Sequence, residues 1–402
     1  MRLFAPLSHK PFAALWGALM LVEFGAQIGN FALIWLAVEQ LGDSASYMQS
    51  LQHGSVLLGA ILGGRLLDDR DPRGVLIGAF LLRGAVGLCP ILAAWILGSP
   101  LAGLVVAAIG LALAQAQAEP AMQASMTTIA GDRARREAAN ALVFASLRVA
   151  RLCGRAAPGL LTVVMPVLLL FGLNAGLILL AAGLLIALPR GAPPDRPSGP
   201  PMRGVFAGAR AMAADRELRV FMVTTSFSFI AWVLCVSLGP ALIVHGRDVT
   251  WLGIPPAGGY SLLLAAYGVG NVFGSGSGGL SPGIRAVYAG QAAFGVGGIL
   301  AALAGLYASD GLFMPLMIGA MFVCGVGAVG HDLRQANLIQ AFGPPSTVSA
   351  LARTRMMIGW ASMCAASLVA PSLFRVVGVE ACVALAGVSL IAVSGWAYGR
   401  LR

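Results

Sequence analysis

Long apolar segments, each separated from the next by a short polar connection, run through this chain from end to end. A bilayer core of roughly 30 Å requires about 20 apolar residues per helix. Twelve segments of the 402-residue chain reach that length. They cover residues 12–38, 46–67, 75–97, 101–125, 138–161, 164–188, 219–243, 257–280, 285–308, 312–333, 347–371 and 379–399. We therefore expect an all-α membrane protein with twelve transmembrane helices and no extramembrane domain.

The composition agrees with this expectation, since 58% of the residues are hydrophobic and only 10% are charged. Soluble domains carry about 25% charged residues, so the composition excludes a cytosolic enzyme, a nucleic-acid-binding protein and a disordered chain. The net charge of +10 therefore does not indicate nucleic acid. The six cysteines lie singly in apolar segments, and no metal-ligand spacing occurs. We expect no disulfide, metal or cofactor.

The positions of the cations predict the orientation. With the N-terminus inside, the cytoplasmic flanks hold twenty of the 26 arginines and lysines, whereas the outer loops hold only Arg247 and Arg375. Four more arginines, which are Arg83, Arg148, Arg151 and Arg155, lie within apolar segments. The first segment, 12–38, is too long for a signal peptide. Both termini are therefore predicted to be cytoplasmic.

A proline- and arginine-rich connection divides the chain into two halves. Residues 189–218 contain six prolines, which predicts an extended, solvated linker between a six-helix bundle at 1–188 and a second at 219–402. The halves also resemble each other, because residues 119–124 and 332–336 end corresponding segments at an offset of about 210 residues. We expect two six-helix pseudo-repeats around a central cavity.

One loop carries a motif of a known family. Between the second and third segments the sequence reads Gly63-Gly64-Arg65-Leu66-Leu67-Asp68-Asp69-Arg70-Asp71-Pro72-Arg73. This run resembles the G-x-L-x-D-R-x-x-R-R loop of the major facilitator superfamily, and the similarity extends over all twelve segments. The resemblance implies a gating latch, in which Asp68, Asp71 and Arg73 occupy matching positions. Asp69 and Pro72 replace two arginines of the pattern, which indicates a weaker latch.

Two further stretches narrow the resemblance. Residues 12–27 and 151–154 are similar to the branch of the superfamily that exports drugs and siderophores. Members of this branch export macrolides, dyes or iron chelators, usually by proton antiport. The resemblance implies a multi-pass protein of a bacterial-type inner membrane, which we expect to be monomeric.

The segment 138–161 carries three arginines on one face. Arg148, Arg151 and Arg155 are spaced i, i+3 and i+7. Each intramembrane arginine costs about 2.5–3.5 kcal/mol on insertion scales, so lipid exposure is disfavoured. A guanidinium binds carboxylate or phosphate bidentately, which predicts an anion-binding wall. The alternatives are that Arg148 extends to the cytoplasmic interface and that Arg151 forms an internal ion pair.

The first segment carries a second polar face. Glu23, Gln27 and Asn30 are spaced i, i+4 and i+7. Relatives in the export branch often have an acid one residue after the position of Gly25, where this chain has Ala26, and Glu23 is expected to take its role. A carboxylate in a dehydrated cavity can bind a proton near neutral pH, as proton-coupled transport requires. The alternative is an ion pair between Glu23 and one of the arginines of 138–161.

Two further acidic positions lie near predicted inner ends. Glu119 is predicted to belong to a proton relay or to form a gating salt bridge with Arg148. His331 and Asp332, followed by Arg334, occupy the corresponding place in the second half and are interpreted as a gate.

Aromatic and glycine positions complete the candidates. Trp232 and Trp360 either pack or line the cavity of the second half. The glycine run 268–279 lacks the strand and the lysine of a phosphate-binding loop, so we expect close helix packing.

The sequence therefore predicts a secondary-active exporter. We expect a small organic solute, an anionic chelator such as a siderophore, to leave the cell by proton antiport with alternating access. The alternative is a multidrug pump for macrolides or lipophilic compounds. The expected partners are the solute, protons and the bilayer, without nucleic acid. No nucleophile–base pair or metal-ligand cluster supports an enzyme, and the two-fold repeat argues against a channel.

Overall fold

The computed structural model describes residues 5–67, 71–130, 133–186, 207–277, 283–341 and 345–402. Among these residues no β-strand forms, and the only bridge joins Trp251 to Ile254. Two compact units are present: unit 1 consists of Met1–Gln40 and Leu51–Arg196, and unit 2 consists of Leu41–Ser50 and Pro197–Arg402. The prediction of an all-α chain is confirmed.

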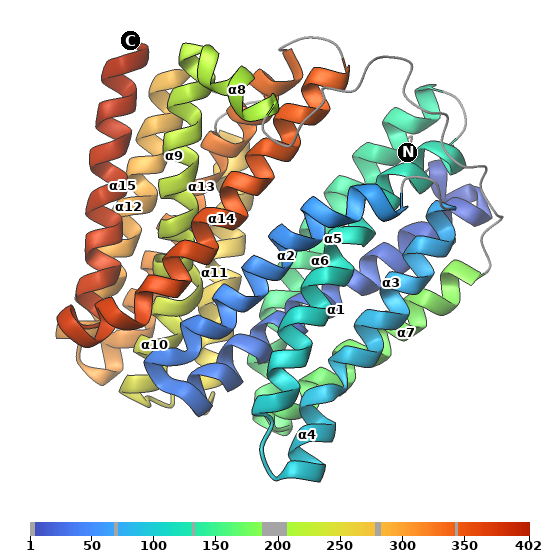
Figure 1. Cartoon of the computed structure of the whole chain (residues 1–402). Helices are drawn as coiled ribbons and strands as arrows, with labels where there is room; N and C mark the ends of the chain where they lie inside the picture. Colours follow the sequence, from blue (N-terminus) through green and yellow to red (C-terminus); the bar gives the residue numbers. More distant parts are fainter. Residues whose placement is uncertain (1–4, 68–70, 131–132, 187–206, 278–282, 342–344) are drawn as a thin grey trace. The chain divides into compact units, whose positions relative to one another are not determined.

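Within the described residues, most of the chain is helical (Figure 1). The first seven are α1 (Lys10–Leu41), α2 (Ala45–Leu67), α3 (Pro72–Gly87), α4 (Cys89–Leu97), α5 (Leu101–Ala130), α6 (Arg133–Val164) and α7 (Leu170–Ile186). The others are α8 (Ala207–Ala214), α9 (Arg216–Trp232), α10 (Leu238–Arg247), α11 (Pro256–Ser277), α12 (Ile284–Tyr307), α13 (Asp310–Ala341), α14 (Pro345–Val377) and α15 (Val379–Leu401).

Nine helical stretches of the described residues are long and apolar enough to cross a membrane. Ten of the twelve predicted spans overlap these stretches. The remaining two are the helices α6, which contains several arginines, and α11, whose glycines and Asn271 lower its hydropathy. The chain is therefore a multi-pass membrane protein, whereas twelve crossings in two repeats remain a prediction.

Two predicted spans are not continuous α-helices. The span 75–97 breaks at Leu88, because Pro90 has no N–H for the helical ladder and starts the new helix α4. The span 219–243 contains a π-turn at Val233–Ser237 between α9 and α10. Pro240 cannot donate its backbone bond to the preceding turn, and the ladder widens there.

The predicted linker is shorter than expected at its C-terminal end. Residues 207–214 form the helix α8, and α9 already begins at Arg216. All six prolines precede residue 202, so nothing prevents the alanine-rich stretch after them from coiling. Residues 187–206 lie outside the described part of the chain.

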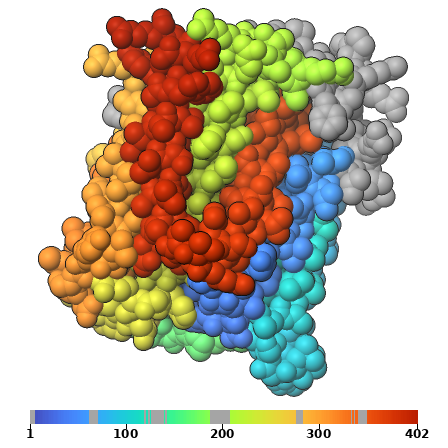
Figure 2. All heavy atoms as spheres, turned by 60° about the vertical axis from the view of Figure 1, so that its left-hand side comes forward, coloured from blue at the N-terminus to red at the C-terminus, as the bar shows by residue number. Residues whose placement is uncertain are grey.

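Each unit has its own apolar core. In unit 1, α3 packs against α5 and α7, and Leu15, Phe80 and Leu185 are among the buried core residues. In unit 2, α12 lies against α13 and α15, while α9 contacts α14 and α15. Figure 2 shows α15 running beside α9 and α12 along one face of unit 2.

Glycines allow the helices of unit 2 to approach closely. A Cβ on Gly270 of α11 would lie 2.2 Å from the carbonyl oxygen of Phe322 in α13. A Cβ on Gly325 of α13 would lie 2.1 Å from the carbonyl oxygen of Tyr267. The backbones of α11 and α13 are therefore in direct contact, as small-residue packing in membranes permits. This confirms the packing interpretation of the run 268–279 for its described residues.

Gly325→Ala is expected to lower the melting temperature of the purified protein by several degrees. Its Cβ would overlap a backbone carbonyl that cannot rotate away, and overpacking costs about 1–3 kcal/mol. The matched control is Gly319→Ala on the same helix, where a Cβ meets nothing within 4 Å. Equal melting temperatures of the two variants would contradict a close α11–α13 contact.

Candidate solute- and proton-binding site

Four polar side chains join α1 to α6 in unit 1. The Nε atom of Arg151 donates to Oε1 of Glu23 at 2.8 Å, and Nε2 of Gln27 donates to the same oxygen at 2.9 Å. The Nε atom of Arg155 donates to Oε1 of Gln27 at 3.1 Å. We call these four residues the α1–α6 cluster. The ion pair that the sequence left open for Glu23 is thus present, with Arg151 as its partner.

The register of the two helices explains this arrangement. Residues 23 and 27 on α1 and residues 151 and 155 on α6 are each one turn apart, so facing pairs recur at the same spacing. Between the two arginines, Gly154 brings α6 onto the α1 backbone: a Cβ there would lie 2.7 Å from the carbonyl oxygen of Phe24. A further bond, from Trp16 Nε1 to Ser146 Oγ at 3.0 Å, joins the same helices.

The α1–α6 cluster carries more positive than negative charge. Glu23 supplies one carboxylate, against the two guanidiniums of Arg151 and Arg155. The Arg151 side chain is 46% exposed and that of Glu23 is 20% exposed, so a ligand can reach the ion pair. Arg148, on the same face of α6, is exposed. A guanidinium can bind a carboxylate of a ligand in a planar, bidentate geometry.

Other predicted site residues lie elsewhere. Asn30 accepts a hydrogen bond from Gln52 of α2 at 3.2 Å and so contacts α2. Trp232 and Trp360 belong to unit 2 and are partly buried. The side chain of Glu119 and the whole of Asp68 lie outside the described residues.

The described part of the predicted latch is a helix cap. Asp71 accepts bonds from the backbone N–H groups of Arg73 and Gly74, both at 3.3 Å, and thereby caps α3. Arg73 donates to the carbonyl oxygens of Leu185 and Ile186 at the end of α7, at 3.1 and 2.6 Å. Within the described residues, the two side chains therefore bind helix ends, where their charges complement the helix dipoles.

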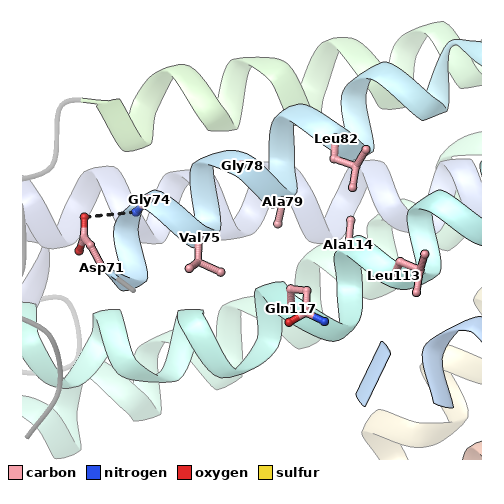
Figure 3. Close-up of a pocket in the computed structure, with 9 residues that line it drawn as sticks. All are labelled: Asp71, Gly74, Val75, Gly78, Ala79, Leu82, Leu113, Ala114 and Gln117. Carbon is pink, nitrogen blue, oxygen red and sulfur yellow. Dashed lines mark hydrogen bonds between the residues drawn. The ribbon is translucent and has the colours of Figure 1, made fainter. Parts of the chain in front are cut away.

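A cavity of about 660 Å³ lies between α3 and α5, beginning at the Asp71 cap (Figure 3). Its described lining is mostly small or apolar, such as Gly78, Ala79 and Leu113, with Asp71 and Gln117 as polar members. Gln117 also donates to the carbonyl oxygen of Gly59 in α2 at 3.1 Å. None of the α1–α6 cluster residues lines this cavity.

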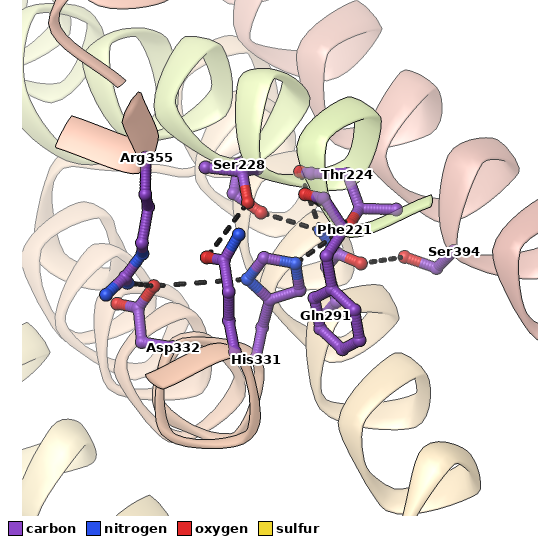
Figure 4. Close-up of polar contacts among 10 residues, drawn as sticks. Phe221, Thr224, Ser228, Gln291, His331, Asp332, Arg355 and Ser394 are labelled. Atoms are coloured by element: carbon purple, nitrogen blue, oxygen red, sulfur yellow. Dashed lines mark hydrogen bonds and ion pairs between the residues drawn. The ribbon is translucent and has the colours of Figure 1, made fainter. Parts of the chain in front are cut away.

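The predicted gate at 331–332 forms part of a polar group in unit 2 (Figure 4). Asp332 accepts a bond from Nη2 of Arg355 in α14 at 2.7 Å. The Nδ1 atom of His331 lies 3.9 Å from Oδ1 of Asp332. Arg334, expected to join this gate, instead pairs with Glu217 of α9 at 2.9 Å. These two ion pairs link α13 to α14 and to α9.

The sequence interpretation missed two partners and one buried amide. In the sequence Arg355 is only one of the twenty cytoplasmic cations and Glu217 has no assigned role, because sequence spacing does not reveal contacts between distant helices. Asn174 of α7 is 1% exposed and lies against α1, where a Cβ on Gly29 would be 2.6 Å from its Nδ2. A lone asparagine within the apolar segment 164–188 was the available signal.

Arg83 remains a buried cation of unit 1. It is 7% exposed, and its Nε atom has no hydrogen-bond partner among the described residues.

A comparison with models of protein families shows to which family the chain belongs. The model of the Major Facilitator Superfamily matches residues 15–363. The chain belongs to this superfamily. Membership confirms the resemblance seen in the sequence at the level of the superfamily, and it implies a transporter and not an enzyme. A comparison with curated proteins gave no match.

Solved structures of transporters have the same fold. A POT family transporter in complex with a thioalcohol-conjugated peptide aligns at 14% identity and a TM-score of 0.71, covering 96% of this chain and 94% of that one. The nucleoside transporter NupG aligns at 10% identity and a TM-score of 0.72, covering 97% and 99%. The peptide transporter POT in complex with alafosfalin aligns at 15% identity and a TM-score of 0.70, covering 98% and 96%. At these identities the likeness shows the fold alone.

Asp71→Ala is expected to destabilise the protein by about 1 kcal/mol, because the helix α3 loses its N-cap. Asp71→Asn keeps a capping oxygen and is expected to melt close to the unsubstituted protein. Melting curves of the two variants in one detergent provide the measurement. An asparagine variant as unstable as the alanine variant would show that the negative charge, and not the cap, is what α3 requires.

Proposed function

We propose that the chain is a proton-coupled secondary-active transporter of a small organic anion, working by alternating access. The expected solute class is a carboxylate or hydroxamate chelator of the siderophore type. The observation that carries the proposal is the α1–α6 cluster, in which one carboxylate oxygen is shared by Arg151 and Gln27. In this proposal Arg151 and Arg155 bind the anion, and Glu23 binds the proton.

The cluster suggests how the two ligands are coupled. A carboxylate of the solute competes with Glu23 for Arg151, because a guanidinium engages carboxylates in one planar geometry. Glu23, once separated from its cationic partner in an apolar environment, binds a proton more readily. Conversely, protonation of Glu23 frees Arg151 for the solute. Proton and anion therefore favour each other at this site.

This coupling bears on the direction of proton movement. Export by proton antiport, which the resemblance to the drug and siderophore branch implies, requires that proton and solute exclude each other. The α1–α6 cluster favours joint binding, and hence movement of proton and anion in the same direction. A lipophilic cation, by contrast, would replace the proton on Glu23 and give antiport. A multidrug pump is therefore the second candidate, favoured by the 20% exposure of the Glu23 side chain.

The remaining roles are part of the same proposal. Asp71, Arg73 and Asp332 are proposed to act in gating, with their described bonds to helix ends and to Arg355 as support. An inner-membrane location with both termini in the cytoplasm rests on the distribution of arginines.

Arg155→Ala is expected to weaken binding of citrate or of a hydroxamate chelator about ten- to hundredfold, because a bond to a charged group contributes about 1.5–3 kcal/mol. Thermal shift measures this, since a ligand at about 100 times its dissociation constant stabilises by about 2.7 kcal/mol. Arg375→Ala is the control, since Arg375 is an exposed arginine of α14 outside the cluster. Shifts given only by a macrolide or a lipophilic cation, and unchanged in Arg155→Ala, would favour the multidrug pump.

Glu23→Gln is expected to abolish solute accumulation driven by a proton gradient in liposomes, while exchange of labelled for unlabelled solute continues. The amide keeps a hydrogen-bonding oxygen but cannot carry the proton. Glu39→Gln on the same helix is the control, since Glu39 lies on an exposed turn and bonds to Trp35.

A pH dye inside the liposomes tests the direction of coupling in the same experiment. Joint movement of proton and anion acidifies the lumen as the solute enters, whereas antiport makes the lumen alkaline. Proton-driven accumulation by Glu23→Gln at the normal rate would contradict the assignment of Glu23.

A further inference from the structure

The inner part of α13 places a buried imidazole next to an exposed carboxylate. The side chain of His331 is 3% exposed, and that of its neighbour Asp332 is 61% exposed. Asp332 is therefore in contact with the surroundings of unit 2, and its Oδ1 atom lies 3.9 Å from Nδ1 of His331. A histidine next to a carboxylate is a candidate for proton binding.

Both ring nitrogens of His331 have polar neighbours (Figure 4). The hydroxyl of Thr224 donates to the carbonyl oxygen of Phe221 at 3.3 Å, so its oxygen is available to accept a bond from Nε2 of His331 at 2.8 Å. The neutral ring then turns the lone pair of Nδ1 toward the carboxylate of Asp332, 3.9 Å away. A proton on Nδ1 replaces this repulsion by attraction, so the surroundings satisfy the cationic ring on both sides.

The other groups around His331 supply one competing cation. On α14, Arg355 holds Asp332 at 2.7 Å. On α9, Phe221 lies against the imidazole with ring centroids 5.1 Å apart, and Glu217 is occupied by Arg334. The neighbours on α12 are neutral: Tyr288 packs on Phe221, and Gln291 donates to the carbonyl oxygen of Thr224 at 3.1 Å. Arg355 and a protonated His331 would therefore share one carboxylate.

We propose that His331 is a second proton-binding site, located in unit 2, with Asp332 as its counter-ion and as the entry point of the proton. The inference rests on the proposed function in that it gives the transporter a second proton besides that of Glu23. The proton comes from water and adds to Nδ1, and no covalent bond of the protein breaks. Asp332 then divides its charge between His331 and Arg355, which weakens the link from α13 to α14.

Nitrogen-15 spectroscopy of the histidine rings tests the site on the full-length protein in lipid nanodiscs. The chain contains only four histidines, so the spectrum is simple, and His331→Gln identifies the signal that belongs to residue 331. The exposed His9 and His245 serve as internal references. Between about pH 8 and pH 5 the His331 signal is expected to change from the neutral ring to the imidazolium.

Two substitutions are expected to act in opposite directions. Asp332→Asn removes the counter-ion and should weaken proton binding by His331 about tenfold. Arg355→Gln removes the competing cation and should strengthen it, while the signals of His9 and His245 stay unchanged in both variants. If one variant fails to fold, the other still provides the test. A ring that keeps one protonation state over the whole range, or that ignores both substitutions, would overturn the proposal.

The outcome is independent of the role of Glu23. The spectra report protonation without transport, so they remain valid if Glu23→Gln transports normally. His331→Gln in the liposome experiment then shows whether the second proton is coupled: we expect the proton-driven rate to lose its dependence on pH in the range in which His331 titrates. An unchanged pH profile would overturn the coupling of His331 and leave the proposal for Glu23 intact.

Discussion

A charged side chain inside an apolar helix bundle needs a partner within hydrogen-bonding distance. In both units, ion pairs of this kind join neighbouring helices. In unit 1 the partner of Arg151 is Glu23, whose oxygen also accepts from Gln27. In unit 2 the carboxylates of Asp332 and Glu217 hold Arg355 and Arg334. Each of these pairs joins two different helices. In unit 1, where Arg151 lies in a predicted span, the cost of inserting its charge favours the approach of α1 and α6.

Polar contact and close backbone contact reinforce each other in this fold. Gly154 lies between the two arginines of α6 and allows that helix to touch α1, so the short Glu23 side chain reaches its partner. A bulkier residue would separate the helices and leave a carboxylate and a guanidinium unpaired in an apolar environment. In α11 and α13 the same kind of contact occurs without charges, and there the glycines serve packing alone.

Much of the architecture could be predicted from the sequence, because hydropathy acts over single segments and needs no knowledge of neighbours. The positions of most helices and the polar faces of 12–38 and 138–161 belong to this part, whereas the ion pair of Glu23 is one of two alternatives that the sequence leaves open. Hydropathy did not predict the break at Leu88, the π-turn or the helix α8. The first two depend on backbone hydrogen bonds next to a proline, and α8 depends on the sequence that follows the last proline of the linker. The partners of Asp332 and Arg334 could not be predicted either, because residues that contact each other from helices far apart in sequence show no regular spacing.

The π-turn at Val233–Ser237 changes how this chain should be compared with its relatives. One additional residue in a helical turn rotates everything after it by about 100°. The faces of α9 and α10 therefore differ in phase, although the two form one continuous stretch of apolar sequence. Suppose that a relative has a regular α-helix in this span. An alignment without gaps inside the span would then match lipid-facing residues of the relative to buried residues of this chain. A one-residue gap within 233–237 is therefore the structurally correct alignment.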